Sequence, residues 1–121
     1  MRRLMWTTGA LTALVCLHAA PALAGWGAIA WDPQSGKSGW IWNQPTAKKA
    51  AEMALSQCGA SACRIVIKPN TGCAAIATIA NGKAAGAAAR ETEDEARLAA
   101  LKQCQKRKAG DCVVRASDCN K

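Results

Sequence analysis

The sequence predicts an α+β fold in which two tandem β-β-α-β units form a two-layer sandwich: an antiparallel sheet, two helices on one of its faces, and disulfides as staples. Two observations support this prediction. The segment Thr46–Cys58 (TAKKAAEMALSQC) recurs in register as Thr92–Cys104 (TEDEARLAALKQC), which indicates one copied supersecondary unit. The second observation is an even set of cysteines after residue 24: Cys58, Cys63, Cys73, Cys104, Cys112 and Cys119.

Residues 1–24 are expected to be a signal peptide. Arg2 and Arg3 give a positive start, an apolar run follows, and Ala22-Leu23-Ala24 is a small-x-small cleavage site. We therefore expect a periplasmic or secreted protein after cleavage near Ala24. No later segment approaches the ~20 apolar residues of a membrane-spanning helix.

The remaining residues 25–121 have the length of a single domain. We divide this domain into two pseudo-repeats, over about residues 26–72 and 73–121. The repeat also pairs Gly36-Lys37 with Gly82-Lys83, so the shared spacing extends beyond the helices.

Strand composition, turn residues and helix caps predict the elements of the first unit. WGAIAW and SGWIWN are two strands around the turn DPQSG. Thr46 is the expected N-cap of a helix that ends at Cys58, with Gly59 as its stop signal. The run RIVIK is a third strand, followed by the turn PNTG. The predicted elements are strand 26–31, turn 32–36, strand 38–43, helix 46–58, strand 64–68 and turn 69–72.

The second unit repeats that order with weaker signals. Residues 74–80 form a strand, Asn81-Gly82 a two-residue hairpin turn, and residues 84–90 the returning strand. Alanine is the best helix former, so propensity alone would also allow one helix over residues 84–108. Gly86 and the capping box of Thr92 with Glu95 favour the strand. The predicted unit ends with a helix over about residues 93–106 and a strand over 111–116.

Disulfides are expected because the core is poor in large side chains. Alanine dominates the apolar residues and the chain has no Phe or Tyr, so burial stabilises it little. An even cysteine count in a small exported chain indicates three disulfides. Repeat symmetry suggests the pairs 58–63 and 104–112, with 73–119 joining the units. A zinc site is the rival, but residues 25–121 have no Cys-x-x-Cys and no histidine, so we expect no metal and no cofactor.

Four tryptophans lie in the first hairpin: Trp26, Trp31, Trp40 and Trp42. They could form an aromatic platform for a protein or a sugar, or they could fill a core of alanine against the small residues Ala87–Ala89. Alternation places Trp40 and Trp42 on one face, where we favour core filling. Trp26 and Trp31 point in opposite directions, and the outward one is the best candidate contact.

The chain is basic, with a formal net charge of +8. The charge concentrates at the end of the second helix, in Lys102, Lys106, Arg107 and Lys108. These residues could attract an anionic surface, or they could simply complement the helix dipole. We favour the second interpretation because no recognition motif accompanies the charge, and we expect no specific nucleic-acid binding.

No catalytic motif is present. The acidic residues Glu91, Glu93, Asp94 and Glu95 are explained by the start of a helix. Carboxylates such as Asp32 or Glu52 could serve a cell-wall hydrolase. Because the domain has no histidine base and no serine nucleophile motif, we expect a protein that is not an enzyme.

The stretch WGAIAWDPQSGKSGWIWNQPT, followed by AEMALSQCGASACRIVI and a second helix ending in Gln-Cys, resembles small exported bacterial proteins known as domain of unknown function 4189. The resemblance runs from Trp26 to Cys119. It implies a secreted or periplasmic disulfide-containing domain with no established activity, and therefore no functional residues to transfer. The alanines of the second hairpin depart from the larger residues that relatives tend to have there.

These observations favour an exported interaction module, monomeric and without catalytic activity, whose tryptophan hairpin contacts a protein or an envelope glycan. Lys106, Arg107 and Lys108 are further candidate contacts. An inhibitor of an envelope hydrolase is one alternative, and a carboxylate-dependent cell-wall hydrolase is another. A purely structural envelope component is the third.

Overall fold

A computed structural model describes residues 25–70, 72–107 and 110–121 of the chain. The predicted signal peptide lies outside these described residues. The element order is β1 (Trp26–Trp31), β2 (Ser38–Gln44), α1 (Ala47–Cys58), β3 (Arg64–Ile67), β4 (Cys73–Thr78), β5 (Ala85–Arg90), α2 (Glu93–Arg107) and β6 (Val113–Cys119). This is the β-β-α-β order twice, so the predicted α+β class and its two tandem units are confirmed.

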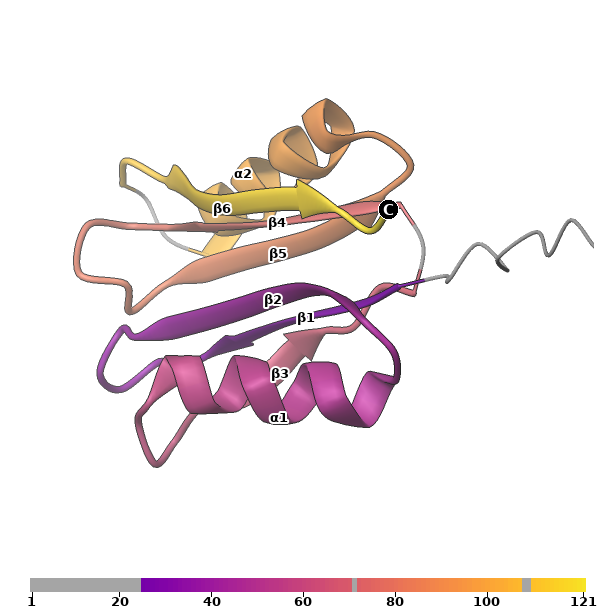
Figure 1. Cartoon of the computed structure of the whole chain (residues 1–121). Helices are drawn as coiled ribbons and strands as arrows, with labels where there is room; N and C mark the ends of the chain where they lie inside the picture. The colour runs from indigo at the N-terminus through magenta and orange to yellow at the C-terminus, as the bar shows by residue number, and fades with distance from the viewer. Residues whose placement is uncertain (1–24, 71, 108–109) are drawn as a thin grey trace, which may run out of the picture.

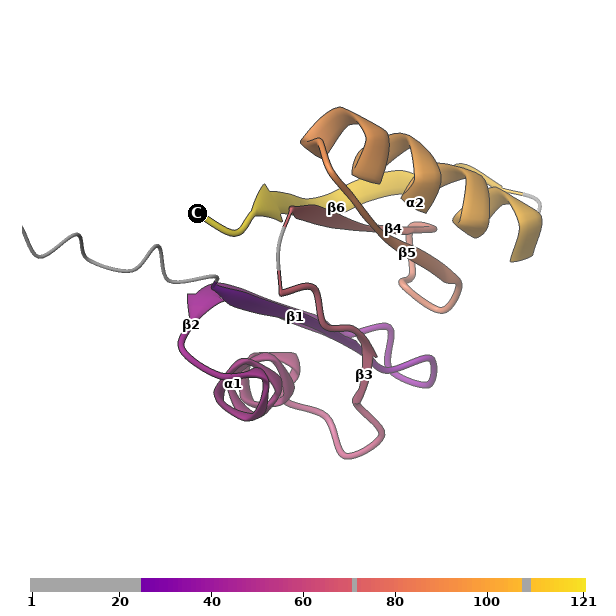
Figure 2. The same ribbon diagram turned by 90° about the vertical axis from the view of Figure 1, so that its right-hand side faces the viewer.

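The six strands form two antiparallel sheets, in the orders β2-β1-β3 and β5-β4-β6, where we expected one. Figures 1 and 2 show the sheets stacked face to face, with α1 on the outer side of one and α2 on the outer side of the other. The expected two layers thus become four, in the order α/β/β/α. Each unit forms a sheet of its own, because β3 pairs with β1 and β6 pairs with β4. One face of each sheet is then left for its own helix and the other for the second unit.

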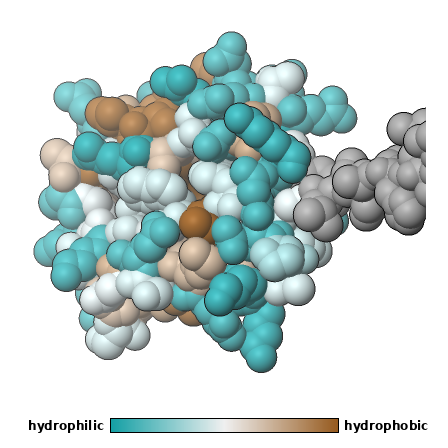
Figure 3. Space-filling view, in the orientation of Figure 1, coloured by the Kyte–Doolittle hydropathy of each residue, from teal (hydrophilic) through white to brown (hydrophobic). Residues whose placement is uncertain are grey.

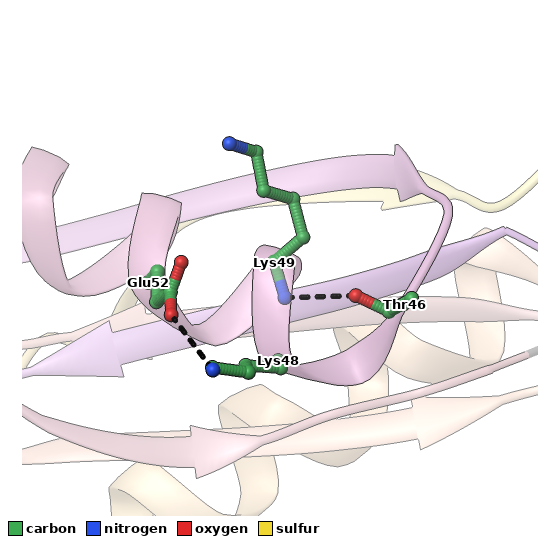
Figure 4. A network of polar contacts seen from close by, with 4 residues as sticks. All are labelled: Thr46, Lys48, Lys49 and Glu52. Carbon is green, nitrogen blue, oxygen red and sulfur yellow. Dashed lines mark hydrogen bonds and ion pairs between the residues drawn. The ribbon is translucent and has the colours of Figure 1, made fainter.

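Local signals place both helices as predicted. Thr46 Oγ1 accepts a hydrogen bond from the Lys49 backbone N–H at 3.1 Å, and α1 ends at Gly59, whose φ is 68°. Figure 4 shows this cap beside the Lys48–Glu52 ion pair, with the Lys49 side chain directed away from both. At the start of α2, Thr92 Oγ1 accepts from the Glu95 N–H at 3.3 Å.

Small residues let each helix lie close to its sheet. The buried helix residues are alanines and one cysteine in each unit: Ala50, Ala54 and Cys58 in α1, and Ala96, Ala100 and Cys104 in α2. Gly39 in β2 and Gly86 in β5 lie directly under these helices. A Cβ on Gly86 would lie 2.7 Å from Gln103 Cβ, and one on Gly39 would lie 2.9 Å from the Gln57 carbonyl carbon. The close approach therefore needs glycine at both positions.

The large side chains are concentrated between the two sheets. Ile29, Trp31 and Ile76 are buried there, and Trp40 and Trp42 pack against the same cluster with Ala85 and Ala89. The predicted packing of tryptophan against alanine therefore occurs, and it occurs across the interface between the units. The helix-side clusters consist mostly of alanine and cysteine.

The three predicted disulfides are present: Cys58–Cys63, Cys104–Cys112 and Cys73–Cys119. The first two tie each helix end to the segment that follows it. Cys73–Cys119 links β4 to β6 within the second sheet, so the expectation that it joins the two units is wrong. The reason is that β6 returns beside β4, with Cys73 and Cys119 directly opposite each other in the ladder.

Two segments of the second unit differ from the predicted ones. The β4–β5 turn is longer than two residues, because the ladder closes at the bond from Ile79 N–H to Ala84 O and leaves residues 80–83 as the loop. The last strand begins at Val113 and runs to Cys119, because its pairing with β4 extends to the disulfide. No helix in the described part of the chain is long and apolar enough to cross a membrane.

Candidate binding site

The four tryptophans of the first hairpin are distributed over two cores. Trp26 packs on the α1 side of the first sheet, while Trp31, Trp40 and Trp42 face the second sheet. Trp31 is 6% exposed and the other three are half-buried. The hairpin therefore does not present an open aromatic platform. Figure 3 shows one face of the molecule, on which hydrophilic residues predominate and hydrophobic ones form small separate patches.

Trp31 is held by a contact between the two units. Its Nε1–H donates a hydrogen bond to the Gly82 carbonyl at 2.6 Å. Gly82 has a φ of 73°, and a Cβ there would lie 2.8 Å from Gly36 Cα, so the two hairpin turns touch. Glycine is required at this contact because it adopts positive φ and has no side chain. The indole ring consequently has one defined position between the sheets.

A cleft of about 170 Å³ opens beside this ring, between the first sheet and the edge of β5. The Arg64 guanidinium lies over the Trp31 ring, 5.8 Å from its centroid, in a cation–π arrangement. Arg107 lines the same cleft from the end of α2. The complete lining is Trp31, Arg64, Val66, Ile76, Ala85, Ala87, Gln103 and Arg107.

A second hollow, of about 440 Å³, lies along α2 beside Arg90 at the end of β5. Its walls carry the cations Arg90, Lys102 and Lys106, one carboxylate from Glu95, and apolar surface from Leu98 and Ala99. Gln103 lines both hollows, so the cleft and this groove adjoin each other.

The cations of the cleft have no carboxylate partner among the described residues. Among the described residues, the one ion pair is Lys48–Glu52 on α1, in which Lys48 Nζ and Glu52 Oε1 are 4.0 Å apart. Arg64 and Arg107 are therefore two guanidinium groups, one from each unit, on the walls of one partly apolar hollow. Planar guanidinium groups bind carboxylate, phosphate and sulfate through paired hydrogen bonds, so the arrangement suits an anionic group.

The family model for the domain of unknown function DUF4189 matches residues 26–119. The chain belongs to this family. The match extends from β1 to β6 and bears out the resemblance seen in the hairpin and helix motifs. No curated protein matches the DUF4189 chain significantly. Among solved structures, the NMR structure of Rv1813c from Mycobacterium tuberculosis is similar, with 23% identity, a TM-score of 0.61 and 99% of each chain covered. At that identity the similarity shows the fold alone.

The DUF4189 structure brings together some of the predicted contact residues and separates others. Trp31 and Arg107 line the same cleft, and Lys106 lines the adjoining groove. Trp26, Trp40 and Trp42 line none of the hollows described here. Lys108 lies outside the described residues.

Sequence reasoning missed Arg64 and Gln103. Arg64 is the first residue of β3 and lies directly opposite Trp31 in the ladder, but this pairing is not evident until the strand order is known. The sequence does carry a signal for Gln103, because this residue recurs at the repeat spacing from Gln57. Arg64 is exposed and Gln103 is half-buried.

Asp32, one of the two carboxylates considered for catalysis, is engaged by its own turn. The Ser35 hydroxyl donates to Oδ2 at 2.7 Å and the Gln34 N–H donates to Oδ1 at 2.8 Å. These bonds hold the pKa of Asp32 below its ordinary value, which keeps the group ionised. Glu52 is on the surface of α1, paired with Lys48.

The cysteines of this DUF4189 domain and Glu93 are engaged in structural contacts. All six cysteines after residue 24 are in disulfides, and no group of three His, Cys, Asp or Glu within the described ranges could hold a metal. At the start of α2, Glu93 accepts a hydrogen bond from the Ser117 hydroxyl at 2.7 Å. That bond ties the helix start to β6.

Proposed function

We propose that this domain is an exported, non-enzymatic binding module, and that the cleft beside Trp31 holds an anionic group of a protein or envelope-glycan partner. The observation that carries the proposal is the placement of one arginine from each unit around one buried tryptophan. Arg64 lies over the ring of Trp31, and Arg107 lines the cleft from α2.

The two guanidinium groups make this placement favourable for an anion. Val66, Ile76 and alanine form an apolar part of the cleft floor, beside the two guanidinium groups that attract the opposite charge. The ring of Trp31 is rigid, since its N–H is fixed on Gly82. A ligand with a carboxylate and a short apolar portion would match both the charge and the floor. The proposal keeps two predicted residues, Trp31 and Arg107, and omits the rest of the tryptophan platform.

Disulfides support the exported location. Three disulfides in a small domain are typical of proteins that mature in an oxidising space such as the periplasm or the cell exterior. The small alanine core gives these crosslinks a clear role in stability.

Citrate is a suitable small probe because it carries several carboxylates and no backbone amides. We expect citrate to shift the NMR signal of the Trp31 indole N–H in the oxidised protein. Arg64→Gln and Arg107→Gln should each weaken citrate binding by about fivefold or more, since each removes one charge-assisted contact. Lys49→Gln, which removes a cation from the exposed surface of α1, is the matched control and should bind normally. A Trp31 signal that ignores citrate, or equal binding by all three variants, would show that the cleft is not an anion site.

A further inference from the structure

We infer that the partner is an extended acidic segment of another protein, which adds to the free edge of β5 as a fourth strand of the second sheet. This inference rests on the proposed function, because it names the kind of ligand that the Trp31 cleft receives. Its central observation is that the open backbone edge of β5 lies between the two cation-lined hollows.

The pairing of β5 with β4 determines which backbone groups face outward. The bond from Ile79 N–H to Ala84 O marks a hydrogen-bonded pair at the turn. Hydrogen-bonded pairs alternate with non-bonded ones in an antiparallel ladder, so Gly86 and Ala88 point their backbone groups toward β4. Ala85, Ala87 and Ala89 therefore point theirs to the open edge. The Arg90 side chain confirms this orientation, because its Nη1 donates to the Ala89 carbonyl at 2.7 Å.

The two repeats treat this edge differently. On β2 the equivalent outward N–H belongs to Trp40. Gln57 Oε1 accepts a hydrogen bond from this N–H at 3.3 Å, so it is already satisfied within the chain. Gly39 and Gly86 lie under their helices in the same way, so Trp40 corresponds to Ala87 and Gln57 to Gln103. No such bond links Gln103 to Ala87 within the described ranges. Gln103 instead lines both hollows, which leaves the β5 edge accessible for strand addition.

The two hollows suit the side chains of an added strand. Side chains alternate between the two faces of a sheet, so one set would point to the α2 side and the other toward the first sheet. The groove of about 440 Å³ receives the first set and the cleft of about 170 Å³ receives the second. Both contain apolar surface, from Leu98 and Ala99 in the groove and from Trp31 and Val66 in the cleft.

Charge selects the chemistry of the added segment. The two hollows together carry five cations and one carboxylate: Arg64, Arg90, Lys102, Lys106 and Arg107 against Glu95. A second copy of this chain is a poor occupant, because its own β5 edge is cationic and its net charge is +8. An acidic strand is attracted by the same cations. An acidic glycan shares that attraction but cannot form the backbone ladder.

The decisive experiment separates backbone pairing from charge. The probe is a fluorescein-labelled peptide of alternating Glu and Val, six residues long, whose binding to the oxidised protein is followed by fluorescence anisotropy. Two analogues carry N-methyl groups on the odd or on the even residues, which removes one of the two outward rows of N–H groups. We expect one analogue to lose about tenfold or more in affinity and the other to resemble the parent, since only one row faces β5. Equal affinities for the parent and both analogues would overturn strand addition.

Variants of the protein test the same edge. Ala89→Pro removes an outward N–H, lies outside the lining of both hollows and leaves the β4 ladder intact, as proline is tolerated on an edge strand. It should reduce peptide binding about fivefold or more while the Trp31 signal still responds to citrate. Lys102→Gln should weaken peptide binding and reduce the salt dependence of that binding, and it should leave the fold unchanged because Lys102 is exposed. Lys49→Gln should change neither the affinity nor its salt dependence. Peptide-induced NMR shifts on β6 in place of β5 would also contradict the inference.

The outcomes distinguish the two proposals. Citrate binding at Trp31 together with peptide affinity that ignores N-methylation would leave the anion site in place and reject strand addition. An alternating analogue of Lys and Val that binds as well as the Glu peptide would reject the acidic partner. Absence of both citrate and peptide binding would reject both proposals.

Discussion

Gly36 and Gly82 touch each other where the two hairpin turns meet. Their φ angles are 77° and 73°, and a Cβ on Gly82 would lie 2.8 Å from the Gly36 Cα. Each unit thus contributes one glycine with a positive φ to the contact. The Trp31 indole donates to Gly82 at this point, so the contact also positions the ring that lines the cleft.

Gly82→Ala should destabilise the protein through this contact. An alanine there would have an unfavourable positive φ, which costs about 1–2 kcal/mol, and its Cβ would displace the Gly36 backbone, which costs about 1–3 kcal/mol more. Gly59→Ala is the matched control, because its φ is also positive at 68° but its Cβ would have no neighbour closer than 3.7 Å. Urea unfolding should therefore give a larger loss for Gly82→Ala. Equal losses would mean that the turns do not press on each other.

Trp31→Phe should leave the Gly82 carbonyl without its buried donor. The lost hydrogen bond should lower the free energy of unfolding by about 1–3 kcal/mol, and the smaller area of the phenylalanine ring should lower it further. Trp26→Phe makes the same change in size on the other face of β1, where no described residue accepts a bond from the indole. Chemical denaturation of both variants measures the difference. A Trp26 variant that is as unstable as the Trp31 variant would argue against the hydrogen bond as the cause.

Removal of the Cys73–Cys119 disulfide should cost more stability than removal of Cys58–Cys63. The two bridges close loops with sequence separations of 46 and 5 residues. Chain entropy predicts losses of about 4 and about 2 kcal/mol for the paired alanine variants. Thermal unfolding under oxidising conditions tests this order. The reverse order would show that native contacts around the helix end, rather than loop closure, determine the contribution of each bridge.

Asp32 should make the protein sensitive to acid. Its pKa is lowered in the folded state by the Ser35 hydroxyl and the Gln34 N–H, so it contributes stability above its unfolded pKa of about 3.9. That contribution is lost as the pH falls below about 4 and through the lower folded pKa. Asp32→Asn keeps an acceptor for the Gln34 N–H but does not titrate. Its stability should fall less steeply than that of the wild type over this range, and parallel pH profiles would contradict the assignment.

Much of the local structure could be predicted from the sequence. Thr46 and Thr92 cap the starts of the two helices and Gly59 caps the end of the first, and these positions could be predicted because caps and stop signals act within a few residues. The strand prediction for residues 85–90 is confirmed, because Gly86 and the capping box at Thr92 outweigh the helix propensity of alanine. Repeat symmetry also identified all three cysteine pairs. The last strand was misplaced because its extent depends on pairing with β4, which no local signal reports.

The candidate site was only partly predictable. Trp31 and Arg107 attracted attention as an aromatic and a cation, but nothing in the sequence placed them together. Arg64 is an ordinary surface arginine until β3 pairs with β1 and brings it opposite Trp31. The contrast between Gln57 and Gln103 is visible only when the side-chain contacts of both repeats are compared.

The sequence by itself determined the copied unit and the order of its elements, because both depend on short-range spacing that repeats along the chain. Only the tertiary structure decided that the units form two sheets which face each other, with the Trp31 cleft at their margin. Strand alternation defines two faces for each sheet, but buried residues occupy both faces of β1 and β4. Which layer covers which face therefore follows from the packing of large side chains between the units.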